Sequence, residues 1–378
     1  MAKKKSKINF LLKVISTLSI VSTLLAYLSP YVHPESLWVL PFFGLSYPIL
    51  FFINLLLTVI WFFKRSKWSI TFLIILFIGT PINLRFFALG NPNIVPKEKN
   101  QSLHVMSYNV QLFGLYNFDL KYDLQNRDSI LHYIEKENPD VICFQEFYYK
   151  NKPTKFNTKD TLISSLKIKD YHEKYSFNKN GKRHFGITTL SKHKIISKGD
   201  VIFEDDEKLS EDNYCIYTDI IKNRDTFRIY NTHFQSIKFK KEEYALFSPD
   251  KEEELSKKKS ALMLMVSKLR KAFPIRANQA LTVIDHVHKS PYPVIICGDF
   301  NDTPLSFTYN QFNEKYVDAF RNNGYGIGKT FVGKIPAGRI DYIFHSKNLN
   351  SYQFKLQEEV FSDHRAISCK VYKKQENK

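Results

Sequence analysis

Cysteine is scarce in this chain, and several short catalytic motifs are missing. Four cysteines in 378 residues stand singly in apolar segments, without Cys-x-x-Cys spacing. Isolated thiols of this kind are typical of a buried core, so no zinc site is predicted, although one disulfide is an open alternative. The chain also contains no glycine-rich phosphate loop, no His-Glu-x-x-His and no serine nucleophile elbow. The hydrolase chemistries that depend on those motifs therefore lack their parts.

The first hundred residues differ sharply from the rest. They hold 11 of the 55 Lys and Arg but only 2 of the 37 Asp and Glu, so half of the net charge of +18 lies there. Apolar runs cover about residues 8–28, 37–63 and 68–87. Each is near or above the roughly 20 residues that cross a bilayer as a helix, which predicts three transmembrane helices. A cleaved signal peptide is the alternative for the first run, but no small-x-small site follows it.

The basic clusters predict an orientation. Lys3–Lys7 and Lys64–Lys67 flank apolar runs, whereas the loop Ser29–Glu35 has no Lys or Arg. Basic loops stay in the cytoplasm, so we expect a multi-pass protein with a cytoplasmic N-terminus and a periplasmic or extracellular carboxyl-terminal domain. Asn83 and Arg85 shorten the third run, and the topology inverts if that run only lies on the surface. The predicted domains are a membrane anchor at 1–90, a linker at 91–100 and a soluble domain at 101–378.

The soluble part predicts a mixed α/β sandwich. A strand at 104–111, a helix at 123–138 and a strand at 141–146 make a unit of the βαβ type. Further strands are predicted at 187–190, 214–221, 226–232, 294–297, 341–345 and 366–372, and further helices at 160–166, 253–271 and 275–288. Many strands interrupted by few helices favour a sandwich over a strictly alternating parallel fold.

The stretch Pro293–Asn301 organises this part of the chain. Four apolar residues run straight into Gly-Asp-Phe-Asn, which is typical of a buried strand followed by a tight turn. Asp299 and Asn301, two residues apart, then face the same way if the extended conformation persists. A carboxylate and an amide are thereby placed at the carboxyl end of a core strand.

Other polar residues also recur where predicted strands end or begin. These residues are Asn109, Glu146, His233, Asp341, Asp363 and His364. Any one of them has an ordinary explanation as a turn cap or a surface side chain. Together they supply what metal-assisted phosphoryl transfer needs, because Mg²⁺ prefers oxygen ligands such as Glu146 and Asn109. Histidines and an amide serve as base and as donors to phosphate, and Asp341 is suited to hold a histidine tautomer.

The motifs that carry these residues resemble those of the endonuclease/exonuclease/phosphatase, or deoxyribonuclease I-like, superfamily. Their order along the chain is Ser-Tyr-Asn-Val at 107–110, Phe-Gln-Glu at 144–146, Asn-Thr-His-Phe at 231–234, Gly-Asp-Phe-Asn at 298–301, Arg-Ile-Asp-Tyr at 339–342 and Ser-Asp-His at 362–364. Residues 185–191 resemble an inner strand of the family, with Thr188 replacing a small residue. The resemblance spans about residues 102–371 and says little about the substrate.

The resemblance implies a four-layer sandwich of two packed mixed β-sheets flanked by helices. It also implies a metal, Mg²⁺ or Mn²⁺, held by Glu146 with Asn109 beside it and with Asp363 on the metal side or holding water. Asp299 would orient or deprotonate the attacking water. Asn301 would steady that water and the phosphate. His233 would protonate the leaving oxygen or stabilise charge on the phosphate, and His364 would sit against the scissile phosphate, paired with Asp341. The acid and base roles of the two histidines are left exchangeable.

Arg276 and Gln279, one helical turn apart, are candidates to reach toward the site, with Arg276 as a weak substrate-binding candidate. A plain helix surface is the alternative.

The resulting prediction is a membrane-anchored, Mg²⁺-dependent hydrolase of a phosphodiester in nucleic acid or in a lipid head group. The alternatives are a phosphomonoesterase acting on inositol-type phosphates and an inactive phosphate-binding module on the same fold. The predicted partners are the lipid bilayer, through the N-terminal helices, and the phosphoester substrate. Basic and aromatic residues near the motif loops fit nucleic acid and an anionic membrane surface equally well. The sequence identifies no protein partner.

Overall fold

The computed structural model describes residues 2–91, 95–96, 101–115, 120–151, 154–177, 182–203, 213–237, 255–333 and 337–374. The chain forms two compact units: a helical unit of Met1–Phe86 with Thr303–Asn310, and a sheet unit of Phe87–Asp302 with Gln311–Lys378. Most of the predicted linker at 91–100 lies outside the described residues.

The helical unit contains α1 (Ala2–Leu28), α2 (Leu40–Phe63), α3 (Trp68–Ile78) and α4 (Thr80–Phe86). Two stretches, Lys7–Leu28 and Leu40–Phe63, are long and apolar enough to span a membrane. The third predicted span is a pair of helices, α3 and α4, bent by 58° at the break between them. Pro81 lies at the start of α4, and because proline disfavours helical geometry in the residue before it, a break there is expected. The described residues therefore contain two candidate membrane spans, or three if the bent pair α3–α4 is one span.

A polar seam joins α1 and α2. Ser19 Oγ donates to Asn54 Oδ1 at 2.8 Å, and Asn54 Nδ2 donates to Thr23 Oγ1 at 2.7 Å. One helical turn further toward the start of α1, Trp61 Nε1 donates to Ser16 Oγ at 2.8 Å. Small hydroxyl residues let helices approach closely, and their hydrogen bonds hold apolar helices together where the hydrophobic effect does not.

The segment Thr303–Asn310 belongs to the helical unit although it is far away in the sequence. Leu305 is fully buried in an apolar cluster with Ala26, Tyr47 and Ile82. The segment begins one residue after Asp302, the last residue of the sheet unit before the chain crosses over.

The sheet unit contains two six-stranded sheets. The first has the strand order β13-β14-β2-β3-β5-β4, and the second has the order β10-β12-β9-β8-β7-β6. The first sheet comprises β2 (Leu103–Asn109), β3 (Val141–Lys150), β4 (Asp170–Phe177), β5 (Arg183–Ser191), β13 (Leu349–Leu356) and β14 (Ile367–Lys373). The second comprises β6 (Ile195–Val201), β7 (Tyr214–Lys222), β8 (Asp225–His233), β9 (Val294–Asp299), β10 (Val317–Asp318) and β12 (Asp341–His345). Both are mixed, since β2–β3 and β8–β9 pair in parallel and the other neighbours are antiparallel.

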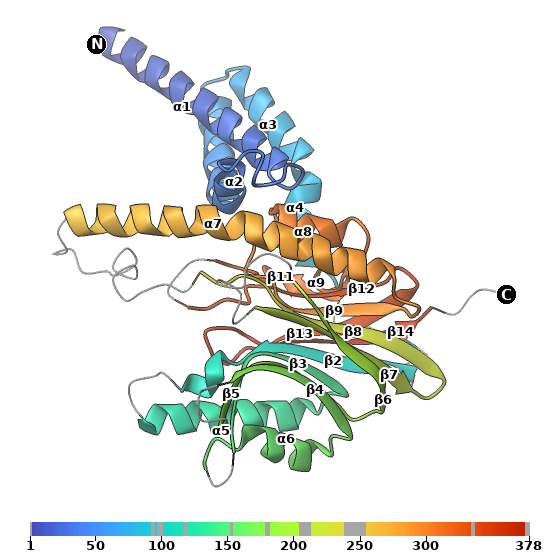
Figure 1. Cartoon of the computed structure of the whole chain (residues 1–378). Coiled ribbons are helices and arrows are strands. Elements are labelled where there is room, and N and C mark those ends of the chain that lie inside the picture. Colours follow the sequence, from blue (N-terminus) through green and yellow to red (C-terminus); the bar gives the residue numbers. More distant parts are fainter. Residues whose placement is uncertain are drawn as a thin grey trace. The chain divides into compact units, whose positions relative to one another are not determined.

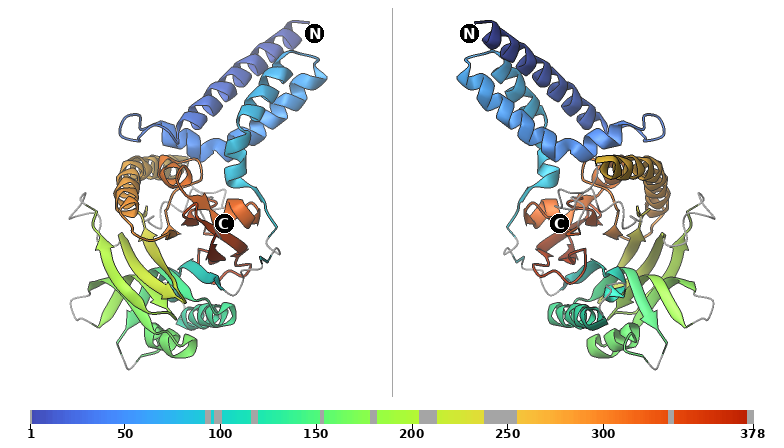
Figure 2. Two further views of the ribbon diagram at one scale, coloured as in Figure 1. Left: turned by 90° about the vertical axis from the view of Figure 1, so that its right-hand side faces the viewer. Right: turned by 90° about the vertical axis from the view of Figure 1, so that its left-hand side faces the viewer.

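The sheets stack face to face between helices, which confirms the predicted four-layer sandwich (Figure 1). Helices α5 (Leu120–Glu137) and α6 (Thr158–Leu166) cover the outer face of the first sheet, and α7 (Leu255–His288) covers the second, as the views in Figure 2 also show. Apolar side chains fill the space between the sheets, among them Val105, Cys143 and Ile295. All four cysteines are buried free thiols, as predicted.

Two features of the fold differ from the prediction. The predicted helices at 253–271 and 275–288 are one continuous helix, α7, with Pro274 inside it. Proline removes one N–H donor from a helix, but Phe273 and Ala277 are buried on either side and favour continuation. The pattern also missed β4, β6 and β13, because polar residues interrupt the alternation that marks a strand.

Candidate active site

Three predicted site residues lie side by side on neighbouring strands. In the second sheet, Asp299 at the end of β9 pairs with His233 at the end of β8 and with Asp341 at the start of β12. Strand register therefore places these three residues, which are far apart in the sequence, on one rung. The exposed fraction of each is 5% or less.

The turn after β9 requires the residues that the sequence has there. Gly298 has φ +151°, and a Cβ at this position would lie 1.9 Å from Thr232 O, so only glycine lets β8 and β9 approach this closely. Asn301 has φ +53°, a conformation that asparagine tolerates better than most residues. Its N–H donates to Asp299 Oδ1 at 2.8 Å, and its Nδ2 donates to Phe234 O at 3.1 Å.

Glu146 reaches the site from the first sheet through a β-bulge. The sequence placed it at the end of its strand, but β3 continues to Lys150, and its pairing with β5 shifts register between Phe144 and Phe147. Glu146 has φ +48°, which is unfavourable for a glutamate. Bulges redirect side chains, and here the Glu146 carboxylate lies 3.9 Å from His233 Nε2.

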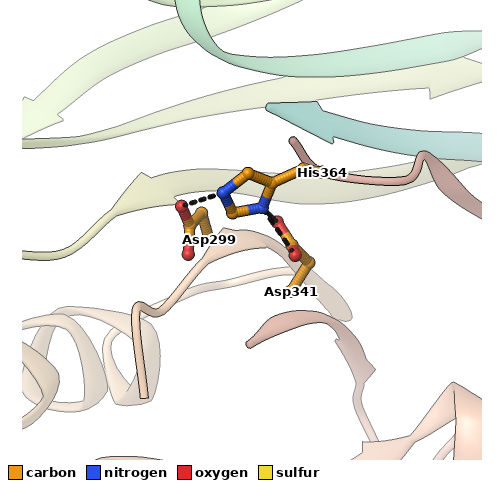
Figure 3. A group of neighbouring side chains, drawn as sticks. All are labelled: Asp299, Asp341 and His364. Atoms are coloured by element: carbon orange, nitrogen blue, oxygen red, sulfur yellow. Dashed lines mark hydrogen bonds and ion pairs between the residues drawn. The ribbon is translucent and has the colours of Figure 1, made fainter. Parts of the chain in front are cut away.

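His364 lies between two aspartates (Figure 3). Its Nδ1 is 2.9 Å from Asp341 Oδ2, and its Nε2 is 3.6 Å from Asp299 Oδ2. Burial lowers the pKa of His364, but the charges of Asp341 and Asp299 outweigh it, so the pKa lies well above its usual range. A hydrogen bond from Nδ1–H to a carboxylate fixes the ring orientation and turns Nε2 toward Asp299.

Asn109 links the carboxylates that come from the two sheets. Its Nδ2 donates to Asp299 Oδ2 at 3.0 Å and lies 3.4 Å from Glu146 Oε1, while its Oδ1 accepts from Gln111 N at 3.1 Å. Ser362 Oγ donates to Asn109 O at 2.9 Å and accepts from His364 N. This serine is a supporting residue that the sequence analysis did not single out, although it stands inside one of the quoted motifs.

Two further amides inside the motifs form a polar connection between the sheets. Gln145 Nε2 donates to Asn231 Oδ1 at 2.7 Å, and Asn231 Nδ2 donates to Phe144 O and to Thr188 O. Both amide side chains are fully buried. The bulged strand that carries Glu146 is thereby tied to the strand that carries His233.

Arg276 and Gln279 both lie on α7, with side chains that are 1% and 3% exposed. Gln279 Oε1 accepts from Gln235 N at 2.8 Å, and Arg276 Nε donates to Gln235 O at 2.7 Å. The alternative of a plain, solvated helix surface does not describe these two side chains.

Several carboxylates of this site have raised pKa values. Partial burial and the charge of Asp363 raise the pKa of Glu146 to about 7, and burial also raises the pKa of Asp299 and of Asp363. One potential ligand atom each of Asp299, Asp341 and His364 lies within 4.8 Å of the others. A bound divalent cation favours the ionised form of neighbouring carboxylates and prefers their oxygens as ligands. These residues therefore fit Mg²⁺ or Mn²⁺.

The raised pKa of Glu146 leads to a prediction about the metal-free protein. Between pH 4.5 and about 7 the folded state keeps a proton that the unfolded chain has lost, so this group makes the fold less stable as pH rises through that window. We expect Glu146→Gln to raise the Tm of the metal-free full chain relative to wild type at pH 8, with little effect at pH 5. Differential scanning fluorimetry in EDTA measures this, and an equal shift at both pH values would contradict it.

Two stacked mixed sheets with such a site at their strand ends define a class of hydrolases that act on phosphoesters. Residues 106–364 match the Endonuclease/Exonuclease/phosphatase family, and the chain belongs to this family, as its motifs indicated. Family membership implies a phosphoesterase. Residues 9–86 match a second family, described as a domain of unknown function, DUF8431.

Several solved structures are similar to this chain. An endonuclease/exonuclease/phosphatase from Bacteroides vulgatus has 14% identity and a TM-score of 0.50, covering 72% of this chain and 99% of that chain. A family protein from Leptotrichia buccalis has 18% identity and a TM-score of 0.48, covering 71% and 99%. The human Nocturnin catalytic domain with bound sulfate has 18% identity and a TM-score of 0.48, covering 72% and 95%. At 14% identity and a TM-score of 0.50, the likeness to the Bacteroides vulgatus structure concerns the fold alone. Among curated proteins, none matches this sequence.

Proposed function

We propose that this chain is a membrane-anchored, divalent-metal-dependent phosphodiesterase that uses water as its nucleophile. The observation that carries the proposal is that a partly buried Glu146 and the buried Asp299 and His364 lie in one cluster: Asn109 Nδ2 contacts both carboxylates, and His364 Nε2 lies 3.6 Å from Asp299 Oδ2. The substrate class is a phosphodiester, in nucleic acid or in a lipid head group.

Glu146 would hold the cation, with Asp363 on the same side and with Asn109 orienting the carboxylate. A bound Mg²⁺ or Mn²⁺ supplies charge stabilisation for the phosphoryl oxygens. The charge of Asp363 already acts on Glu146 in the metal-free site, which supports grouping these two carboxylates. Asn109 Nδ2 contacts Glu146 Oε1, so Oε2 is the oxygen that would bind the cation.

Asp299 is the candidate that orients and deprotonates the attacking water. Its Oδ1 is held by the N–H of Asn301, so Oδ2 is the oxygen that faces the two histidines. A base must be held within hydrogen-bond reach of the proton it accepts, and the bonds from Asn301 N and Asn109 Nδ2 hold the Asp299 carboxylate in one orientation for this role. Asn301 would contact the water and the phosphate, in addition to its bond to Phe234.

The two histidines would contact the phosphate from different segments, His233 from the end of β8 and His364 from the segment before β14. His364 Nε2 and His233 Nε2 lie 3.6 Å and 3.7 Å from the same oxygen of Asp299. The raised pKa of His364 favours the imidazolium, so we assign it to stabilise negative charge on the phosphate. His233 is then the group that protonates the leaving oxygen. Asp341 keeps His364 oriented and contacts no substrate.

The proposed topology keeps the basic clusters at Lys3–Lys7 and Lys64–Lys67 in the cytoplasm and the catalytic domain on the outer side. The pair of candidate spans, with the bent pair counted as a third, supports a multi-pass anchor. A periplasm-dependent reporter fused after Lys378 should be active, and a signal from a cytoplasm-dependent reporter instead would reverse the orientation.

The function is tested with the full chain in nanodiscs. We expect it to hydrolyse bis-p-nitrophenyl phosphate with Mg²⁺ or Mn²⁺ and not with EDTA. Plasmid DNA, RNA, sphingomyelin-type lipid and inositol phosphates then separate the substrate classes, and turnover of phosphomonoesters alone would replace the diesterase proposal. No turnover of any phosphoester with either metal would contradict the proposed function.

A further inference from the structure

Helix α7 holds both main-chain polar groups of one loop residue. Gln279 accepts from Gln235 N, and Arg276, one turn earlier on the helix, donates to Gln235 O, at 2.8 Å and 2.7 Å. The side chain of Gln235 is held as well, because Asn213 Nδ2 donates to its Oε1 at 2.8 Å. A loop residue whose N–H, C=O and side chain are all bonded has little conformational freedom.

Gln235 is two residues after His233, and the residue between them is fixed too. Phe234 N donates to Asp299 O at 3.0 Å, and Phe234 O accepts from Asn301 Nδ2 at 3.1 Å. The Phe234 ring packs on Phe300 with the ring centroids 4.9 Å apart. The segment from His233 to Gln235 is thus held by the β9 turn on one side and by α7 on the other.

The guanidinium of Arg276 bonds the main chain of Gln235 although it is buried. It is 1% exposed, and among the described residues its Nη2 has no hydrogen-bond partner. The charges of Asp302 and Asp299 act on it, but its hydrogen bond among the described residues is to the main-chain oxygen of Gln235 and not to a carboxylate. Burying a cation without a paired anion is unfavourable, so its presence here indicates a function that an apolar side chain does not perform.

We propose that Arg276 and Gln279 are positioning residues that fix the location of His233 by clamping Gln235. This inference rests on the proposed function, since it assigns support to a residue of the same site. Arg276 then contacts no substrate, and its effect on the reaction passes through the His233 ring. Misplacement of a reacting group by about 1 Å can cost on the order of 100-fold in rate.

The test is a double-mutant cycle in the full chain, with bis-p-nitrophenyl phosphate as substrate. We expect Arg276→Met to lower kcat by about 10- to 100-fold, with KM changed by less than about threefold. In a His233→Ala background the same substitution should cause little further loss. An equal fold-loss in both backgrounds would show that Arg276 does not act through His233 and would overturn the inference.

Two further variants keep the inference testable if Arg276→Met fails to fold. Gln279→Met keeps side-chain volume and removes the acceptor for Gln235 N, so it should reproduce the kcat loss, whereas Gln279→Glu keeps the acceptor and should retain more activity. Wild-type kcat in Gln279→Met would overturn the clamp.

The matched control is Arg228→Met. Arg228 is a buried arginine of β8 that bonds Asp219 at 2.6 Å and 2.8 Å, five residues before His233 and about 16 Å along the strand. It should lower Tm and leave kcat unchanged. An inactive wild-type chain would count against the proposed function, whereas an active wild type with normal kcat in Arg276→Met would count against the clamp alone.

Discussion

In His364→Ala, kcat for a phosphodiester is expected to fall by about 10³-fold, with the metal still bound. The side chain lies between Asp341 and Asp299, and its two ring nitrogens face these two carboxylates. Alanine removes the His364 imidazolium, which would stabilise negative charge on the phosphate, and leaves Asp341 and Asp299 without the ring between them. Preorganised electrostatic stabilisation of this kind, with proton transfer, accounts for losses of this size.

The matched control for that experiment is His345→Ala. His345 is a second buried histidine, four residues after Asp341 on β12, where its Nε2 lies 2.9 Å from Ser351 Oγ. Its removal should lower stability and leave kcat near wild type. Steady-state kinetics and a Tm for each variant separate the two effects. Wild-type turnover in His364→Ala would remove the proposed mechanism.

Glu146→Gln is expected to abolish the response of the protein to Mg²⁺. Loss of an outer-shell partner weakens metal binding by up to about 100-fold, and loss of a ligand carboxylate should exceed that. At a Mg²⁺ concentration 100 times the wild-type Kd, binding stabilises the fold by about 2.7 kcal/mol, and a 100-fold weaker site retains only about 0.4 kcal/mol. Thermal unfolding with and without Mg²⁺ measures this directly, independently of catalysis.

Glu173→Gln is the control for the loss of a carboxylate. Glu173 lies on β4, in the same sheet as Glu146, and forms an ion pair with Lys159 at 2.9 Å. It is not part of the candidate site. Its Mg²⁺-induced rise in Tm should equal that of wild type. A normal Mg²⁺ response in Glu146→Gln would assign the metal to other residues, with Asp299, Asp341 and His364 the first alternative.

The residues that gather in the candidate site could be predicted from the sequence because local residue patterns mark the ends of strands. The apolar run into Gly298 and Asp299 identified both a buried strand and its carboxyl end, and the pairing of β8, β9 and β12 brought His233 and Asp341 to the same rung. The layered fold also followed from motif order through the family resemblance. These features depend on side-chain type and spacing, which a single sequence displays.

The parts that were missed depend on main-chain geometry. The bulge that turns Glu146 inward arises from the register between β3 and β5, and no residue type marks it. Arg276 and Gln279 bond the main chain of Gln235. Because any residue except proline has these main-chain groups, the residue type at position 235 does not predict the contacts. Helix α7 crosses Pro274 because burial on both sides outweighs a local preference, which only the tertiary structure determines.

The crossing of the chain at Asp302 has a practical consequence for producing this enzyme. Immediately after that residue, Leu305 is buried among Ala26, Tyr47 and Ile82, which belong to the predicted membrane anchor. A shortened protein that begins after Phe86 would leave Leu305 without those neighbours, on a loop four residues after Asn301, which ends the motif that carries Asp299. We therefore expect such a truncation to alter the loop after Asp302, and kinetic constants measured on the fragment would describe a protein with an altered loop.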